Sequence, residues 1–310
     1  MRDPFHDGER AIQEQTGERD IALINGQMIA DRIPAAAKVF LTQQRYCLLG
    51  GAAADGDLWA LLVCGEPGFA RTDEARQTLH LRIDDRLGVF ARTPPLAMLR
   101  EGDPLGLLFI ELATRRRLRV NGRCSHPGAD EWVIAIDQAN PLCPKYIQRR
   151  QPVERVAASA SDAAPADATI DSGQALTEAL VEWITTADTF FVASAHSDGS
   201  ADVSHRGGRP GFVRHQAGVL RIPDYRGNSM FNTLGNFAVN PRAGLSFIDF
   251  DGNRQLQMTG DVRLDLAAGA ADPDTGGTGR WWEFRPRQWF VSPLNLPLAW
   301  TFVDASPFNP

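Results

Sequence analysis

The sequence predicts a mainly β protein with minor α content, built from two similar β domains in tandem. Three sequence blocks of the first half recur in the same order in the second half: 65–71 in 208–214, 80–85 in 219–224, and 103–123 in 241–261. The chain has 310 residues, which fits two domains of ordinary size. Because one unit occurs twice, the differences between the copies should mark the functional site.

The first half combines short helices with a series of strands. Residues 5–16 place apolar side chains on one helical face, and residues 34–44 indicate a second short helix. Gly, Pro and Asp then separate six short apolar or alternating runs: 45–52, 58–64, 79–84, 105–112, 116–123 and 131–137. Six runs at this spacing favour an antiparallel barrel or sandwich. We therefore expect an N-terminal helical segment over 1–33 and a first β domain over 34–150.

The second half repeats this series after a linker. Residues 151–172 are Ala, Ser, Asp and Pro with almost no large apolar side chains, which is typical of a linker. A helix is predicted over 177–187. The strand series then returns: 189–197, 201–208, 218–224, 243–250, 254–264 and 281–291. The second β domain should span 173–310.

Composition excludes several classes of function. The net charge of −6 argues against nucleic acid or an anionic membrane surface as a partner. No apolar stretch reaches the roughly 18 residues of a membrane span, and the N-terminus is charged, so we expect a cytoplasmic protein. The spacing of the cysteines indicates neither zinc binding nor a disulfide framework; they are Cys47, Cys64, Cys124 and Cys143. Lys38 and Lys145 are the only lysines, so a phosphate group would be held mainly by arginine.

One predicted hairpin strand differs in charge between the copies. In the first copy its polar face carries Arg117, Arg119, Asn121 and Arg123, which alternate with small or apolar residues. In the second copy the aligned face is neutral or acidic: Gln255, Gln257, Thr259 and Asp261. A solvated face and a binding site or interface both account for this difference.

Hydrogen-bond donors are densest between residues 201 and 245 of the second copy. The donors are Ser204, Arg206, Arg209, Arg226, Asn228, Ser229 and Asn232. Four glycines in the same segment allow close approach of the backbone to a ligand: Gly207, Gly208, Gly211 and Gly227. Charge, forked donors and little bulk suit a phosphate monoester. The first copy has Arg86 and Gly88 there but no Asn–Ser pair, so only the second copy is expected to bind a ligand.

Four segments resemble a known family: 5–13, 142–148, 202–214 and 222–250. They are similar to the flavin-nucleotide-binding proteins related to pyridoxamine 5'-phosphate oxidase. The resemblance implies two tandem six-stranded split barrels with FMN between them, the first a degenerate copy and the second carrying most of the site. True oxidases carry a lysine in their phosphate motif, whereas this chain has Asn228-Ser229-Met230.

The resemblance also assigns roles to residues. Ser204, His205 and Arg206 would run beside the isoalloxazine ring, and residues 226–232 would hold the phosphate. The full cofactor-binding set is Ser204, His205, Arg206, Gly207, Pro223, Asp224, Arg226, Gly227, Asn228, Ser229 and Asn232. Lys145 and His205 are the candidate catalytic residues.

The leading functional hypothesis is an FMN-dependent oxidoreductase acting on a small molecule, with NAD(P)H as candidate electron donor. The alternatives are a flavin-binding or storage module without turnover, and a haem-binding split barrel. Hydrolytic and Rossmann motifs are absent from the sequence. No metal site is expected, since Asp251-Gly252-Asn253 indicates a hairpin turn and His6 is interpreted as structural. The two copies should form an internal pseudo-dimer or pair with a second chain.

Overall fold

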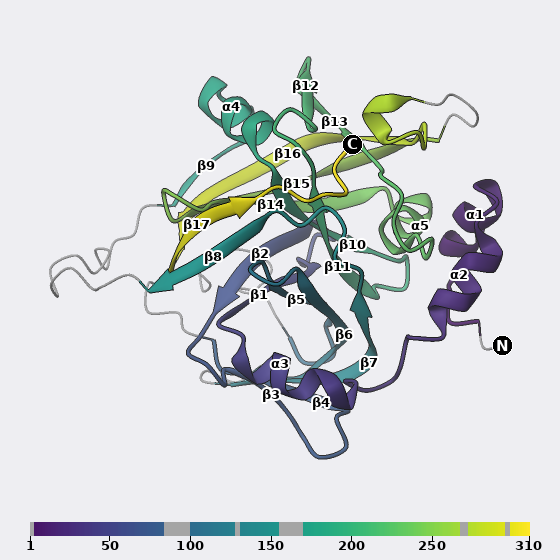
Figure 1. The fold of residues 1–310 in the computed structure, drawn as a ribbon, viewed down its shortest axis with the longest axis vertical. Coiled ribbons are helices and arrows are strands. Elements are labelled where there is room, and N and C mark those ends of the chain that lie inside the picture. Colours follow the sequence, from purple (N-terminus) through teal and green to yellow (C-terminus); the bar gives the residue numbers. More distant parts are fainter. Residues whose placement is uncertain (1–2, 84–99, 128–130, 155–169, 267–271, 295–297) are drawn as a thin grey trace, which may run out of the picture.

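Two antiparallel sheets dominate the computed structural model (Figure 1), which describes residues 3–83, 100–127, 131–154, 170–266, 272–294 and 298–310. The first sheet contains β1 (Tyr46–Ala52), β2 (Leu58–Cys64), β3 (Ala70–Thr72), β4 (Thr78–Leu81), β5 (Pro104–Glu111), β6 (Arg116–Pro127) and β7 (Trp132–Leu142). The second contains β10 (Thr189–Ala195), β11 (Ala201–Gly207), β12 (Arg214–Gln216), β13 (Val219–Pro223), β14 (Arg242–Asp249), β15 (Arg254–Asp265) and β16 (Trp281–Pro293). The fold is therefore mainly β, as predicted.

The two sheets have the same strand order. It is β2-β1-β5-β6-β7-β4-β3 in the first sheet and β11-β10-β14-β15-β16-β13-β12 in the second. Strands β5 and β14, and likewise β6 and β15, begin and end at aligned residues of the sequence repeat. Each sheet curves around its own core without closing, which gives two split barrels. Among the described residues the first sheet has seven strands and the second has eight, since β9 (Asp171–Gly173) also pairs with β16. Six strands were expected in each, because three-residue strands such as β3 and β12 leave no readable alternation.

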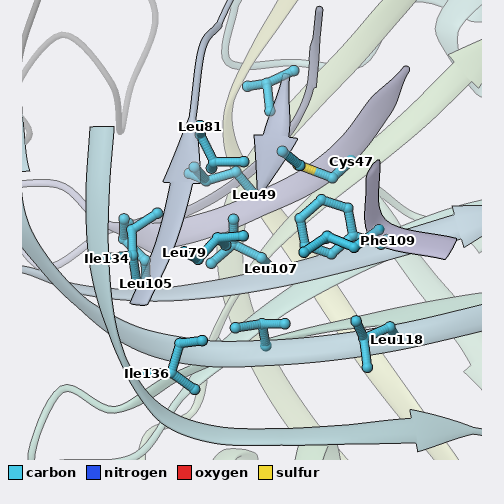
Figure 2. Packing of buried hydrophobic residues seen from close by; sticks show 14 of the residues in the cluster. Cys47, Leu49, Leu79, Leu81, Leu105, Leu107, Phe109, Leu118, Ile134 and Ile136 are labelled. Carbon is cyan, nitrogen blue, oxygen red and sulfur yellow. The ribbon is translucent and has the colours of Figure 1, made fainter. Parts of the chain in front are cut away.

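Each barrel has its own apolar core. Figure 2 shows the first, in which Leu49, Leu107 and Ile134 meet from β1, β5 and β7. Successive residues of a strand point to opposite faces, so alternate apolar side chains of each strand enter this core. The second core is richer in aromatic residues and contains Phe190, Phe247 and Trp282, with the first two rings stacked at 4.9 Å.

Short helices and a third sheet complete the fold. The chain also forms η1 (Ala35–Ala37), α3 (Lys38–Gln43), α4 (Glu178–Thr186), α5 (Asn232–Val239) and η4 (Pro273–Thr275). Strand β8 (Arg149–Glu154) pairs with β17 (Leu298–Asp304), and β9 (Asp171–Gly173) pairs with β16. The two ends of the expected linker thus lie in strands, and residues 155–169 lie outside the described part of the chain.

The N-terminal helices pack on the second barrel rather than the first. Helices α1 (Asp7–Gln15) and α2 (Arg19–Gly26) lie beside α5 (Figure 1). A Cβ atom on Gly8 would lie 2.2 Å from the Gly235 carbonyl oxygen, so α1 and α5 approach closely because both positions are glycine. The helix predicted over 5–16 is confirmed as α1, whereas α2 was not predicted.

The barrels pack against each other through a shared apolar cluster that includes Leu48, Leu108, Phe191 and Trp300. The contact is reciprocal. A Cβ atom on Gly106 of β5 would lie 2.7 Å from the backbone of Asp202, and one on the aligned Gly244 of β14 would lie 2.5 Å from Trp59 Cα. Asp202 and Trp59 are the second residues of β11 and β2. The same surface of each barrel therefore meets the other, as in a two-fold symmetric dimer.

Two further observations concern the chain as a whole. No helix among the described residues is long and apolar enough to cross a membrane. All four cysteines lie in the described part of the chain, none of them forms a disulfide, and Cys47, Cys64 and Cys124 are buried.

We predict that Gly244→Ala and Gly106→Ala each lower the free energy of unfolding by about 1–3 kcal/mol, because the new methyl group must displace backbone across the interface. Chemical denaturation measures the effect. Gly227→Ala is the control, since a Cβ atom there would meet nothing within 4 Å. If both interface variants unfold at the same denaturant concentration as the wild type, the reciprocal contact is contradicted.

Candidate functional site

A cavity of about 130 Å³ lies between the barrels. Its walls come from both halves of the chain. The first barrel contributes Arg117 and Arg119 of β6, Leu142 of β7, and Cys143, Lys145 and Tyr146 of the following loop. The second barrel contributes β11 from Ser204 to Gly207 and the segment from Pro223 to the first turn of α5. The site therefore exists only because the barrels pack together.

The polar face of β6 forms one wall. Arg119 is only 5% exposed, donates to the Asn232 side chain at 2.7 Å and to the Ser204 hydroxyl, and pairs with Asp202 at 3.3 Å. Arg117 donates to the Cys143 carbonyl at 3.0 Å. Burial lowers the pKa of Arg117 to about 10, so its guanidinium remains charged at neutral pH. The face that sequence alone left open between solvent and a site is thus the wall of a cavity.

His205 lines the cavity and has two ring nitrogens without a hydrogen-bond partner. The side chain is 7% exposed, and its ring meets Phe191 edge-on at 5.6 Å. Neither Nδ1 nor Nε2 has a hydrogen-bond partner. Burial, reinforced by the charges of Arg117 and Arg206, lowers the pKa of His205 well below its ordinary value of 6.5. The imidazole is therefore neutral and has one donor and one acceptor available to a ligand.

The segment before α5 and the start of that helix line the same space. Ser229 and Phe231 have left-handed backbone, with φ of 62° and 60°. Helix α5 starts without a side-chain cap, and its first three residues, Asn232 to Leu234, line the cavity. The first N–H groups of a helix have no partner within the helix and carry partial positive charge. This geometry favours an anion.

The charges around the cavity are unbalanced. Within the described part of the chain, four cationic side chains line it, namely Arg117, Arg119, Lys145 and Arg206, against the single carboxylate of Asp224. Asp224 is buried and shared, since Arg206 contacts it at 2.7 Å and Arg280 at 3.1 Å. In a chain of net charge −6, this local positive excess indicates an anionic ligand.

The N-terminal helices hold the amide-bearing segment in place. Gln13 donates to the Met230 carbonyl at 3.0 Å, and Asn25 donates to the Asn228 carbonyl at 2.8 Å. Glu18 accepts from the Ser229 hydroxyl at 2.5 Å and pairs with Arg280 at 3.0 Å. Sequence reasoning assigned no site role to these residues. The sequence feature that could have indicated such a role is the similarity of residues 5–13, which include Gln13, to a known family.

Glu9 is the second carboxyl group that the N-terminal helices bring to this segment. It accepts from the Asn232 side chain and from the His6 backbone N–H, the latter at 2.9 Å. Burial, together with the charge of Asp202, raises the pKa of Glu9 to about 8. Asn232 thus lies between Arg119 of the first barrel and Glu9 of the N-terminal segment.

The structure brings most of the predicted site residues together. The cavity is lined by Lys145, Ser204, His205, Arg206, Gly207, Pro223, Asp224, Gly227, Asn228, Ser229 and Asn232. Arg226 differs. Its side chain is exposed and does not line the cavity, whereas its carbonyl accepts from Lys145 Nζ at 3.4 Å and from Tyr146 Oη at 3.0 Å. The Ser229 hydroxyl is already bonded to Glu18.

In the other half, the corresponding strands β2 and β15 are joined directly by hydrogen bonds. Strand β2 is buried along its length, and its fourth to sixth residues, Leu61 to Val63, replace Ser204 to Arg206 of β11. Gln255, aligned with Arg117, accepts from the Leu62 N–H at 3.1 Å, and Gln257, aligned with Arg119, donates to the Ala60 carbonyl at 3.3 Å. These hydrogen bonds join the side chains of β15 to the backbone of β2. Arg86, the predicted counterpart of the ligand-binding segment, lies outside the described residues.

The sequence comparison agrees with this geometry. Residues 176–289 match the family model of pyridoxamine 5'-phosphate oxidase. The second barrel belongs to this family. The matched residues contain β11, the segment before α5 and α5 itself, which form one side of the cavity. No curated protein matches the chain.

Several solved structures are similar to parts of the chain. One is a pyridoxamine 5'-phosphate oxidase-related, FMN-binding protein from Nostoc punctiforme, with 12% identity, 44% of this chain and 100% of that chain covered, and a TM-score of 0.27. HutZ, a haem storage protein from Vibrio cholerae, has 13% identity, coverages of 38% and 95%, and a TM-score of 0.29. An FAD-binding protein from Mycobacterium smegmatis has 10% identity, coverages of 37% and 95%, and a TM-score of 0.26.

The pKa of His205 gives a prediction about stability. Because the unfolded chain takes up a proton below pH 6.5 and the folded site does not, wild-type stability falls as the pH drops below that value. His205→Leu, which copies Leu62 of the first barrel, removes this loss. Relative to wild type, the variant should gain up to about 2 kcal/mol between pH 7 and pH 5. Urea unfolding at several pH values measures it, and a difference that does not vary with pH would refute the assignment.

Proposed function

We propose that this protein is an FMN-binding flavoprotein in which the flavin lies between the two barrels. The observation that carries the proposal is the interbarrel cavity, which combines four cationic side chains, a free helix N-terminus and an unpaired neutral histidine. An anionic phosphate and a polar heteroaromatic ring together match these donors. One phosphate group accounts for them, which favours FMN over a dinucleotide such as FAD.

The chain's residues divide between the two ends of such a ligand. The amides of α5, with Arg119 beside Asn232, would hold the phosphate, and β11 would place His205 against the ring. The space of about 130 Å³ is smaller than the roughly 300–1,000 Å³ of most ligand sites. A whole flavin must therefore extend past the half-buried Tyr146–Tyr225 pair, whose rings are 5.1 Å apart, or displace it.

The same site supports oxidoreductase activity on a small molecule, with NAD(P)H as the electron donor. FMN supplies hydride and electron transfer when bound. The contribution of the chain is electrostatic: Lys145 and Arg117 place positive charge on the wall from the first barrel, where it stabilises negative charge that develops on a ligand. Because one chain supplies both walls, we propose that the site needs no second copy. Four described cysteines without a disulfide fit a reducing compartment such as the cytoplasm.

A haem-binding function is the second candidate, and His205 favours it. A buried neutral imidazole with free nitrogens inside a cavity has the chemistry of an axial haem ligand. The absorbance spectrum of the purified protein separates the two ligands. Bands at about 370 and 450 nm indicate flavin, and a Soret band at about 400 nm indicates haem. Flavin released by heat should run as FMN; release of FAD, or no uptake of flavin, would count against the proposal.

The two copies suggest substitutions that test the cationic wall. Arg119→Gln and Arg117→Gln each introduce the residue found at the aligned position of the second copy. Those aligned residues are Gln257 and Gln255, which bond to the β2 backbone. We predict a roughly 10- to 100-fold weaker FMN affinity for each, because a charge-assisted contact is lost. The Arg119→Gln substitution should weaken the binding of riboflavin, which lacks the phosphate, less than it weakens the binding of FMN. Fluorescence titration measures both ligands.

The control for this series is Arg123→Gln. Arg123 lies on the same face of β6 but is exposed and outside the cavity. Its FMN affinity should equal that of wild type. Equal affinities for all four proteins would mean that the flavin binds elsewhere.

Lys145→Ala distinguishes an enzyme from a storage protein. If the protein is a reductase, anaerobic NADH or NADPH should bleach the flavin absorbance, and Lys145→Ala should slow this step more than it weakens FMN binding, since the Lys145 ammonium acts on developing charge. Stopped-flow absorbance measures the rate. If only a chemical reductant bleaches the flavin in wild type, the storage function is the better account.

A further inference from the structure

A second cavity, of about 170 Å³, lies on the other side of Asn232, which lines both spaces. Its charge is opposite to that of the first. Four carboxyl groups line it, those of Glu9, Asp137, Asp198 and Asp202, and no lysine or arginine does so among the described residues. Arg119 reaches Asp202 from outside this cavity, at 3.3 Å. Such a surface concentrates cations rather than anions.

Two histidines and an aspartate meet beside this cavity. His6 and His196 line it, and the ligand atoms that they and Asp7 offer all lie within 4.8 Å of one another. The Asp7 carboxylate oxygen is 2.9 Å from His196 Nε2 and 3.7 Å from His6 Nδ1. A tetrahedral ion with bonds of about 2.0–2.1 Å separates its ligand atoms by about 3.3 Å. The two distances to the Asp7 oxygen bracket that value, and the two imidazole ligand atoms lie within 4.8 Å of each other, so binding requires the rings to move closer together.

Each imidazole also has an acidic side chain near its other nitrogen. Asp198 lies 3.1 Å from Nδ1 of His196, and Glu9 lies 3.5 Å from Nε2 of His6. Nε2 of His6 is buried without a hydrogen-bond partner. Metal-bound histidines typically donate their second ring nitrogen to a carboxylate, which fixes the tautomer and the ring orientation. To bind the ion, Nδ1 of His6 would give up only one long contact, in which it accepts from the Glu9 backbone N–H at 3.4 Å.

We propose that His6, Asp7 and His196 bind a divalent transition-metal ion. Two imidazole nitrogens and one carboxylate oxygen suit Zn²⁺ best, with water as the fourth ligand. His6 and Asp7 lie at the start of α1, and His196 directly follows β10. The ion therefore joins the N-terminal helices to the second barrel and fixes the helices that hold residues 228–232. This proposal does not depend on the flavin.

Calorimetric titration of the untagged, chelator-treated full chain with Zn²⁺ tests the site. We expect one ion per chain, and a Co²⁺-substituted protein should show the visible absorption of a tetrahedral site. Asp7→Asn and His196→Ala should each weaken Zn²⁺ binding at least about tenfold, and Asp198→Asn about 10- to 100-fold through loss of the outer hydrogen bond. His215→Ala, on the distant strand β12, should bind Zn²⁺ as wild type does.

Asp7→Asn keeps this test independent of folding, because the Asp7 side chain is 75% exposed and its amide analogue is nearly isosteric. If Zn²⁺ binds without saturating at one equivalent, or binds Asp7→Asn and His196→Ala as tightly as wild type, the proposal is wrong. His196 then acts only as a hydrogen-bonded clasp between Asp7 and Asp198. Because the readout is metal affinity, either result leaves the flavin assignment unaffected.

Discussion

The close approach of β5 to β11 and of β14 to β2 positions every other feature of the molecule. It needs hydrogen in place of a side chain at Gly106 and at Gly244, since a Cβ atom at either position would overlap backbone of the opposite barrel. The approach brings β6 of the first barrel to face β11 of the second. The cavity, its charge and its two-barrel composition all follow from that arrangement.

An interface with two-fold symmetry creates two equivalent places for a cavity, and the sequence determines which stays open. On one side, apolar β2 residues and two glutamines fill the space with hydrogen bonds to backbone. On the other side, Arg119, Asp202 and Asp224 place charges in a nearly dry region, which is unfavourable unless each is paired. The N-terminal helices contribute Glu18, which pairs with Arg280, to this balance. The open site thus requires a segment outside both barrels.

The sequence was sufficient for the features that depend on local pattern. The repeat predicted two β domains, the alternating runs located the longer strands, and residue type identified Ser204 and Asn232 as candidate ligand-binding residues. His205 was identified by the family resemblance. Side-chain direction was not predictable for Arg226, because neighbouring left-handed residues control how that segment turns. Contacts between distant residues also escaped prediction. His196 and Asp7 are 189 residues apart, and the local sequence around neither residue indicates their contact.

The N-terminal helices have a further consequence for the synthesis of the chain. Gln13 binds the carbonyl of a residue 217 positions later, so α1 leaves the ribosome long before its binding surface exists. At roughly 5–20 residues per second, the interval is roughly 10–40 s. During that time Phe5 and Ile12, which are buried in the folded protein, have no native partner. These side chains obtain their native contacts, and the ligand cavity is completed, only after translation of the second barrel.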